Sequence, residues 1–194
     1  MSTIREKFFH PNHFGTIQDA DYIGEAGNKL CGDTIKFFIK EKDGVVTNAK
    51  FQNLGCMYSF ACAEQTAEDC IGKTLQEAQD LTSDDIANHL GGLVDSKEHC
   101  AIMAINALRN ALENKGVEDT NYKPPTISDY QLKIIISKVL DEFVAAEAKS
   151  IGESFSLVSI DAIGKTVTVK VSGRRIAKLV SDLLKRYEFK LIVR

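Results

Sequence analysis

The chain has 194 residues, of which 44% are hydrophobic and 26% charged, a balance typical of globular rather than disordered or fibrous proteins. No apolar run approaches the roughly 18 residues needed to span a bilayer, which excludes an integral membrane protein. The 24 basic and 27 acidic side chains give a net charge of −3, which argues against a general nucleic-acid-binding protein.

The charge changes sign along the chain. Residues 1–128 hold 12 basic and 19 acidic side chains, a net charge of −7, whereas residues 129–194 hold 12 basic and 8 acidic side chains, a net charge of +4. Just before the change, residues 116–128 contain glycine and two prolines with little apolar content. We therefore expect two domains, 1–115 and 129–194, joined by a linker over 116–128.

The first domain is expected to combine an antiparallel hairpin with helices. A short helix over residues 5–9 precedes a glycine-rich loop over residues 19–32. Apolar and polar residues then alternate over 34–40, and Lys42-Asp-Gly44 predicts the turn into a return strand over 45–54. Helices are expected next at 59–71, 75–80 and 84–90, the last capped by Thr82, and from Ser96 to about Leu112.

The second domain is expected to have the order α-β-β-α-β. The pattern predicts a helix from Leu132 to Val144, strands over 155–160 and 165–171, a helix from Ile176 to Tyr187 and a strand over 189–193. The second strand alternates valine with threonine or lysine, as expected of a strand with one buried face. The fold class predicted for the whole chain is therefore α+β.

All five cysteines lie within the first hundred residues: Cys31, Cys56, Cys62, Cys70 and Cys100. The odd number, and an N-terminus without an apolar signal-peptide stretch, predict a reducing, cytoplasmic location, where thiols serve as reactive groups or metal ligands. Cys62 and Cys70 belong to an alanine-rich helix, and we expect both to be buried as packing residues.

The other three cysteines are placed to meet. Cys31 precedes the first hairpin strand and Cys56 follows the second, so an antiparallel pairing brings them to the same end of the hairpin. Cys100 lies in the expected first turn of the long helix, whose N-terminus need only pack there. Free amides at a helix N-terminus and in glycine-rich turns stabilise thiolates.

Two neighbouring residues can complete a metal site. Asp33 offers an oxygen and His99 a nitrogen, so three sulfurs plus one harder ligand suit tetrahedral zinc or one edge of an iron–sulfur cluster. Ligand softness alone does not separate these two, and buried, unligated thiols are the alternative. We expect structural roles for the remaining histidines. His10 and His13 would pack within a loop, and His89 would interact favourably with the dipole at the C-terminus of its helix.

These residues resemble the N-terminal scaffold domain of NifU and its relative IscU over about residues 1–115. The motifs that carry the resemblance are Gly27-Asn-Lys-Leu-Cys31-Gly-Asp33, Leu54-Gly-Cys56, Ile71-Gly-Lys-Thr74, Asp85-Ile-Ala-Asn-His-Leu-Gly-Gly92 and Lys97-Glu-His-Cys100. The resemblance implies an IscU-like antiparallel sheet packed with helices. It also implies a scaffold that receives sulfur from a cysteine desulfurase and iron from a donor, and that delivers labile [2Fe–2S] clusters to apo-proteins.

The resemblance also assigns residues. The ligands would be Cys31, Cys56 and Cys100, with Asp33 tuning cluster lability and His99 as the alternative ligand. Cys100 would be the acceptor of persulfide sulfur. In the apo form, zinc would bind the same residues. The chain could also form a homodimer. Three thiolates and one weaker ligand leave one exchangeable coordination position, which suits transfer of the cluster to another protein. Two departures are visible, the stretch Gly92-Leu-Val-Asp-Ser-Lys97 without the proline that chaperone recognition uses, and no cysteine after Cys100 for a second cluster.

The second domain resembles the Nfu-type domain that ends NifU proteins, through Val139-Leu-Asp-Glu142 and Val171-Ser-Gly173 before a helix. Where that domain carries a CxxC pair, this chain has Arg174, Arg175 and Lys178. We therefore expect a degenerate Nfu-like domain over 129–194 that holds no cluster, with its basic residues forming either a docking surface or an ordinary solvated face.

Two other functions are compatible with the same residues. A zinc-stabilised binding or regulatory module would use the same ligands structurally and would unfold when chelated. An enzyme would use Cys100 as a nucleophile activated by His99, but adjacent helical residues point about 100° apart, so we expect poor placement for proton transfer. The chain is therefore predicted to be a carrier and not an enzyme.

Overall fold

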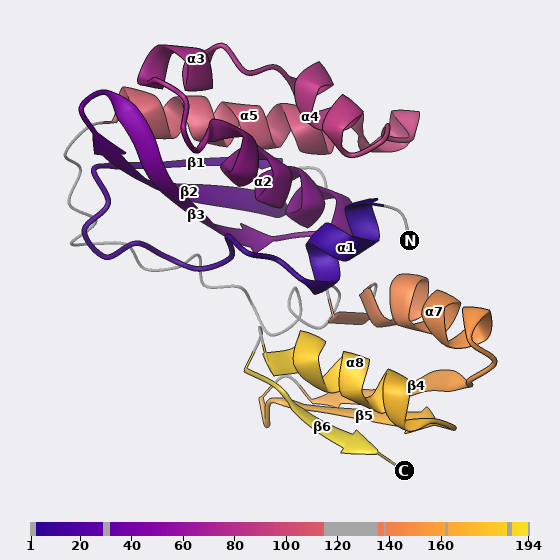
Figure 1. Ribbon diagram of the computed structural model, residues 1–194. Coiled ribbons are helices and arrows are strands. Elements are labelled where there is room, and N and C mark those ends of the chain that lie inside the picture. The colour runs from indigo at the N-terminus through magenta and orange to yellow at the C-terminus, as the bar shows by residue number, and fades with distance from the viewer. Residues whose placement is uncertain are drawn as a thin grey trace. The chain divides into compact units, whose positions relative to one another are not determined.

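The computed structural model describes residues 3–28, 32–114, 136–137, 139–161, 163–185 and 188–193. The chain divides into two compact units, Met1–Asn121 and Tyr122–Arg194, and each has its own three-stranded sheet (Figure 1). The expected linker over 116–128 lies outside the described residues. Within the described part of the chain, no helix is long and apolar enough to cross a membrane.

The sheet of the first unit is antiparallel, in the order β1-β2-β3. It consists of β1 (Tyr22–Asn28), β2 (Asp33–Lys42) and β3 (Val45–Leu54). Asp43 and Gly44 both have positive φ, as a two-residue turn between twisted strands requires, and the predicted hairpin is confirmed. Thr34 pairs with Leu54, so the start of β2 and the end of β3 meet at one end of the sheet.

Helices cover one face of this sheet, with α2 and α5 lying across it (Figure 1). The helical elements are α1 (Thr3–Phe9), α2 (Met57–Cys70), α3 (Leu75–Gln79), α4 (Ser83–His89), the 3₁₀ turn η1 (Asp95–Lys97) and α5 (Glu98–Glu113). Thr82 begins α4 with the predicted cap, because its hydroxyl accepts the N–H of Asp85 while the Asp85 carboxylate accepts the N–H of Thr82. The interior is aromatic, with the rings of Phe51 and Phe60 edge to face at 5.1 Å.

Strand β1 corrects the expectation of a loop over 19–32. Its glycines serve close packing: a Cβ atom at Gly24 would lie well under 3.0 Å from the backbone of Ala111. Helix α5 therefore crosses β1 at backbone contact, and the side-chain amide of Asn110 donates to the Glu25 carbonyl at 2.9 Å beside this crossing. Glycine lowers the strand signal in the sequence while it makes the helix–strand contact possible.

The second unit has the predicted order, and its fold class is confirmed. It contains η2 (Leu140–Val144, a π-helical turn), α7 (Ala145–Ser150), β4 (Phe155–Asp161), β5 (Thr166–Val171), α8 (Arg174–Lys185) and β6 (Lys190–Val193). Strand β5 is central, antiparallel to β4 and parallel to β6, and α8 is the crossover between the parallel strands. Val167 and Val169 are buried with Ile176, Val180 and Leu184 of α8. Residues 132–135 of the expected first helix lie outside the described residues.

Candidate metal-binding site

Cys56 occupies the turn between β3 and α2. It is the N-cap residue of α2, with φ −74 and ψ 169, and its side chain makes no capping hydrogen bond. Its carbonyl accepts the Phe60 N–H at 3.1 Å and the Ser59 hydroxyl at 2.9 Å. The thiol is therefore left for other partners beside the free amides of a helix N-terminus, which favour negative charge.

Asp33 reaches the same turn from the first position of β2. Its Oδ2 accepts the backbone N–H of Cys56 at 3.3 Å, and the residue is only 7% exposed. The β2–β3 register explains this approach, because the residues just before Thr34 and just after Leu54 lie opposite each other. The carboxylate is thus held beside the cysteine by backbone geometry.

Cys100 joins them from the first turn of α5. Its Sγ lies 3.9 Å from the Sγ of Cys56, although 44 residues separate the two in the sequence. One ligand atom from each of Asp33, Cys56 and Cys100 lies within 4.8 Å of the others. Cys100 is fully buried and Cys56 partly exposed, so the group is reached from the Cys56 side.

His99 lies closer to Cys100 than expected. Its Nε2 is 3.5 Å from the Cys100 Sγ, so the expectation that the two side chains point apart is wrong. Backbone directions around a helix differ by 100° between neighbours, but in the first turn no preceding helical turn blocks a long side chain from bending back. His99 is therefore a second non-sulfur group beside the thiols.

Cys31 lies outside the described residues, so its place beside the other two cysteines stays a prediction. The residues that flank it are described. The N–H of Gly32 donates to the Asn28 carbonyl at 2.8 Å, and Asn28 pairs with Asp33 across β1 and β2. Asn28 and Gly32, the described residues on either side of Cys31, therefore lie at the end of the sheet where Asp33 lies.

The two described thiols titrate as a pair. A hydrogen bond from Cys100 lowers the pKa of Cys56 to about 7, and this outweighs the opposing effect of burial. The pKa of Cys100 is raised, first because it donates that hydrogen bond and also because burial and the charge on Cys56 disfavour a second thiolate. Lys97, whose Nζ lies 5.5 Å from the Tyr58 ring, adds to the lowering of the Cys56 pKa. Above about pH 7 the pair therefore holds mainly one thiolate, on Cys56, and one thiol, on Cys100.

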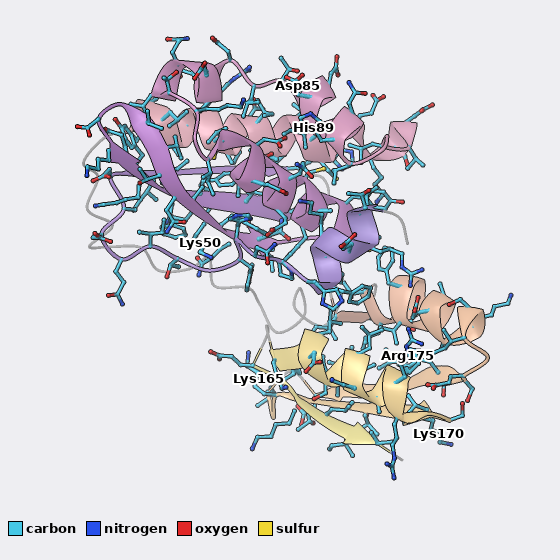
Figure 2. The ribbon with its side chains drawn as sticks, viewed as in Figure 1. Lys50, Asp85, His89, Lys165, Lys170 and Arg175 are labelled. Carbon is cyan, nitrogen blue, oxygen red and sulfur yellow. The ribbon has the colours of Figure 1, made fainter. Side chains whose placement is uncertain are left out.

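The other cysteines and histidines make different contacts. Cys62 and Cys70 are fully buried, and desolvation raises the pKa of each to about 12. His13 Nδ1 lies 2.8 Å from the carboxylate of the buried Glu64. His89, labelled on α4 in Figure 2, has its Nδ1 2.8 Å from Asp69, a side-chain partner that the helix-dipole interpretation did not include.

The residues that hold the Cys56 turn are not among those expected from the sequence. The side-chain amide of Asn53 donates to Ser59 Oγ at 3.2 Å and to the Thr34 carbonyl at 3.3 Å, linking β2 to the first turn of α2. A serine three residues after an N-cap position is the available sequence signal, since its hydroxyl can bond back to the cap carbonyl.

The described group can bind a thiophilic metal. Two sulfurs and one carboxylate oxygen are three of the four donors of a tetrahedral centre, with one position left for a further ligand. Zinc and iron–sulfur clusters both accept this donor set.

Fold and site define a small α+β domain that presents thiol and carboxylate ligands at the end of an antiparallel sheet. The sequence model of the family described as "NifU-like N terminal domain" matches residues 1–120, which is more than half of the chain. The chain belongs to this family. The match ends before the second unit, whose resemblance to the Nfu-type domain stays a prediction.

Individual relatives agree with this assignment. Over 109 residues the chain is 41% identical to "Iron-sulfur cluster assembly scaffold protein IscU 1" of Archaeoglobus fulgidus, covering 56% of this chain and 71% of that protein. Over 116 residues it is 38% identical to "Nitrogen fixation protein NifU" of Azospirillum brasilense, covering 57% of this chain but only 37% of that longer protein. A crystal structure of a hypothetical protein, 22% identical, covers 59% of this chain and 96% of its own with a TM-score of 0.50, and it shows the fold alone.

Proposed function

We propose that this chain is a scaffold on which labile [2Fe–2S] clusters are assembled and from which they pass to apo-proteins. One observation carries the proposal: Cys56 and Cys100, 44 residues apart, have their sulfurs 3.9 Å apart beside a carboxylate. Family membership supports it, as do relatives named iron–sulfur cluster assembly scaffolds. Those names describe scaffolds and not enzymes, and they give no support to the zinc module.

The proposed ligand set is Cys31, Cys56 and Cys100, with Asp33 in the fourth position. Residue 31 is two positions from Asp33 in the sequence, so chain connectivity limits their Cα atoms to about 7 Å apart. Asp33 is the exchangeable ligand, because a carboxylate binds iron less firmly than a thiolate and has a second hydrogen-bonding partner in the Cys56 N–H. His99 is the alternative fourth ligand, since its ring nitrogen lies 3.5 Å from Cys100 Sγ.

Sulfur would enter through the pair of Cys56 and Cys100. A thiolate attacks the terminal sulfur of a persulfide on a cysteine desulfurase, the new S–S bond forms, and the donor cysteine leaves as a thiolate. The resemblance assigns this role to Cys100, whereas the lower pKa and partial exposure favour Cys56 in this conformation. Sulfur delivered to either residue lies within reach of the other, and mass spectrometry of persulfidated single-cysteine variants identifies the first acceptor.

The second unit is proposed to be a docking surface without a cluster of its own. In the first two turns of α8, Arg174, Arg175 and Lys178 are exposed, and within the described part of the unit none of them forms an ion pair (Figure 2 labels Arg175). Cationic groups at a helix N-terminus oppose the helix dipole, and this unfavourable placement supports a function outside the fold. A partner with an acidic surface would match these cationic side chains. The cytoplasmic location and the homodimer stay predictions.

Anaerobic reconstitution with iron, sulfide and thiol tests the scaffold function. The wild-type chain should gain visible absorbance, and replacing Cys31, Cys56 or Cys100 by alanine should abolish it. Cys62→Ala, a deletion of a buried thiol in α2, is the matched control and should keep the colour. A colourless wild-type chain, or a zinc-loaded chain that unfolds when chelated, contradicts the proposal.

A further inference from the structure

Gly55 creates the space that the Asp33 carboxylate occupies. A Cβ atom at residue 55 would lie 2.7 Å from the Cγ of Asp33 and 2.5 Å from the Oγ of Ser59, closer than real Cβ atoms approach other atoms. Gly55 does not have a positive φ, so its backbone conformation does not require glycine. A side chain is excluded at this position by the carboxylate and the hydroxyl that meet there.

The carboxylate in this space has two partners within reach. Its Oδ2 accepts the N–H of Cys56 at 3.3 Å. The same side chain supplies an oxygen within 4.8 Å of the sulfurs of Cys56 and Cys100. A small movement therefore exchanges the backbone hydrogen bond for a bond to a metal held by the two thiols.

A buried network fixes the turn that carries this N–H. The Ser59 hydroxyl donates to the Cys56 carbonyl at 2.9 Å and accepts from the Asn53 amide at 3.2 Å. The Asn53 amide also donates to the carbonyl of Thr34, the residue after Asp33, at 3.3 Å. Ser59 is fully buried and Asn53 is 9% exposed, so water does not compete strongly for these bonds.

We propose that Gly55 is a positioning residue that keeps open a resting place for the Asp33 carboxylate at the Cys56 N–H. Ser59 and Asn53 hold this resting place at a fixed distance from the thiols. The inference rests on the proposed scaffold function. When the carboxylate leaves the cluster, an iron–oxygen bond breaks and the hydrogen bond to the Cys56 N–H forms, with no change of oxidation state. That hydrogen bond offsets part of the free-energy cost of freeing a coordination position on the iron for a recipient's ligand. The cluster is therefore released faster than it would be without the hydrogen bond.

Closing the resting place tests the proposal. Gly55→Ala should slow loss of the reconstituted cluster to excess chelator about tenfold, the rate equivalent of one hydrogen bond to a charged group. In an Asp33→Ala background the same substitution should have no further effect, because no carboxylate remains to be displaced. Equal slowing in both backgrounds shows that Gly55 acts through something other than Asp33 and overturns the proposal.

A second readout needs no cluster. In the ¹⁵N-labelled apo-protein, Gly55→Ala and Asp33→Ala should shift the Cys56 amide resonance in the same direction, because each removes its hydrogen bond. An unchanged Cys56 amide in Gly55→Ala also overturns the proposal. A wild-type chain that gains no cluster contradicts the scaffold function and leaves this amide result standing, so the two failures are distinguishable.

Ser59→Ala keeps the test available if Gly55→Ala does not fold. It removes a hydroxyl from the Cys56 turn and should also slow release, with a shifted Cys56 amide. Thr66→Val is the matched control, since Thr66 is buried in the same helix and its hydroxyl has no hydrogen-bond partner among the described residues. Release rates that are unchanged in Ser59→Ala, or slowed equally in Thr66→Val, refute the role of the network.

Discussion

Gly24→Ala places a methyl group where strand β1 touches helix α5. The new Cβ would lie well under 3.0 Å from the backbone of Asn110 and Ala111, whereas ordinary contacts fall at 3.4–4 Å. No rotamer change can relieve a clash with backbone, so β1 and α5 must separate by about 1 Å or more. Helix α5 carries Cys100 at its other end, and the movement is transmitted through a rigid element.

The expected cost is about 3 kcal/mol, the upper part of the range for overpacking a core, reduced slightly by the preference of a strand for alanine over glycine. Because the chain has two units, a single melting curve mixes two transitions. Amide hydrogen exchange of the central residues of α5 reports the first unit alone, and its slowest amides should lose protection by about a hundredfold.

Gly27→Ala is the matched control in the same strand. Its Cβ would lie 3.0 Å from the Thr34 Cγ2 and 3.3 Å from the Asp33 carbonyl oxygen. Shifts of a few tenths of an ångström relieve both contacts, so the free energy of unfolding should change by less than about 1 kcal/mol. The reasoning is refuted if the two variants lose equal protection, or if Gly24→Ala loses none.

Three further predictions follow from the described contacts. Glu64→Gln should destabilise the first unit by about 3 kcal/mol, measured by hydrogen exchange. The buried carboxylate accepts the N–H groups of Asn12 and His13 and lies against the His13 ring, and in the variant an amide NH₂ would face one of these donors. The rate of alkylation of apo Cys56 should rise with pH through about 7, because its pKa is lowered and the thiolate predominates above that pH. Cys62, whose pKa is raised, should stay unreactive. A midpoint near 9 for Cys56 would contradict the pairing of the thiols. Charge reversal at Arg174, Arg175 and Lys178 should slow cluster transfer to an acidic apo-protein about tenfold at low salt. The control Lys185→Glu, which removes a cation paired with Asp182, should leave the transfer rate unchanged. Equal slowing by both changes would contradict the docking role.

The hairpin and the residues at its open end could be predicted from the sequence. Alternation and the Asp43-Gly44 turn fix the register, and the register places Asp33 beside Cys56. The position of Cys100 could only be hypothesised, because it depends on how α5 packs over the sheet. Strand β1 was missed because Gly24 weakens the strand pattern, and its reason for being glycine is a contact with a helix 87 positions later.

Side-chain placement was less predictable than backbone placement. The spacing of His99 and Cys100 fixes the angle between their Cα–Cβ bonds, but the ring still reaches the sulfur by its own torsions. The role of Gly55 could not be predicted, since nothing in the sequence shows that a carboxylate fills the space where its side chain would be. Side-chain torsions decide the first case and a close approach between segments distant in the sequence decides the second, and local sequence patterns specify neither.

The central claim, that these thiols hold a cluster only transiently, is tested most directly by following one cluster from donor to acceptor. The loaded chain is mixed anaerobically with an apo-ferredoxin, and visible circular dichroism monitors both proteins at once. We expect the acceptor to gain its cluster at the rate at which this chain loses its own, and Asp33→Ala to slow both together. Retention of the cluster by the chain, or iron loss that precedes any gain by the acceptor, would contradict it.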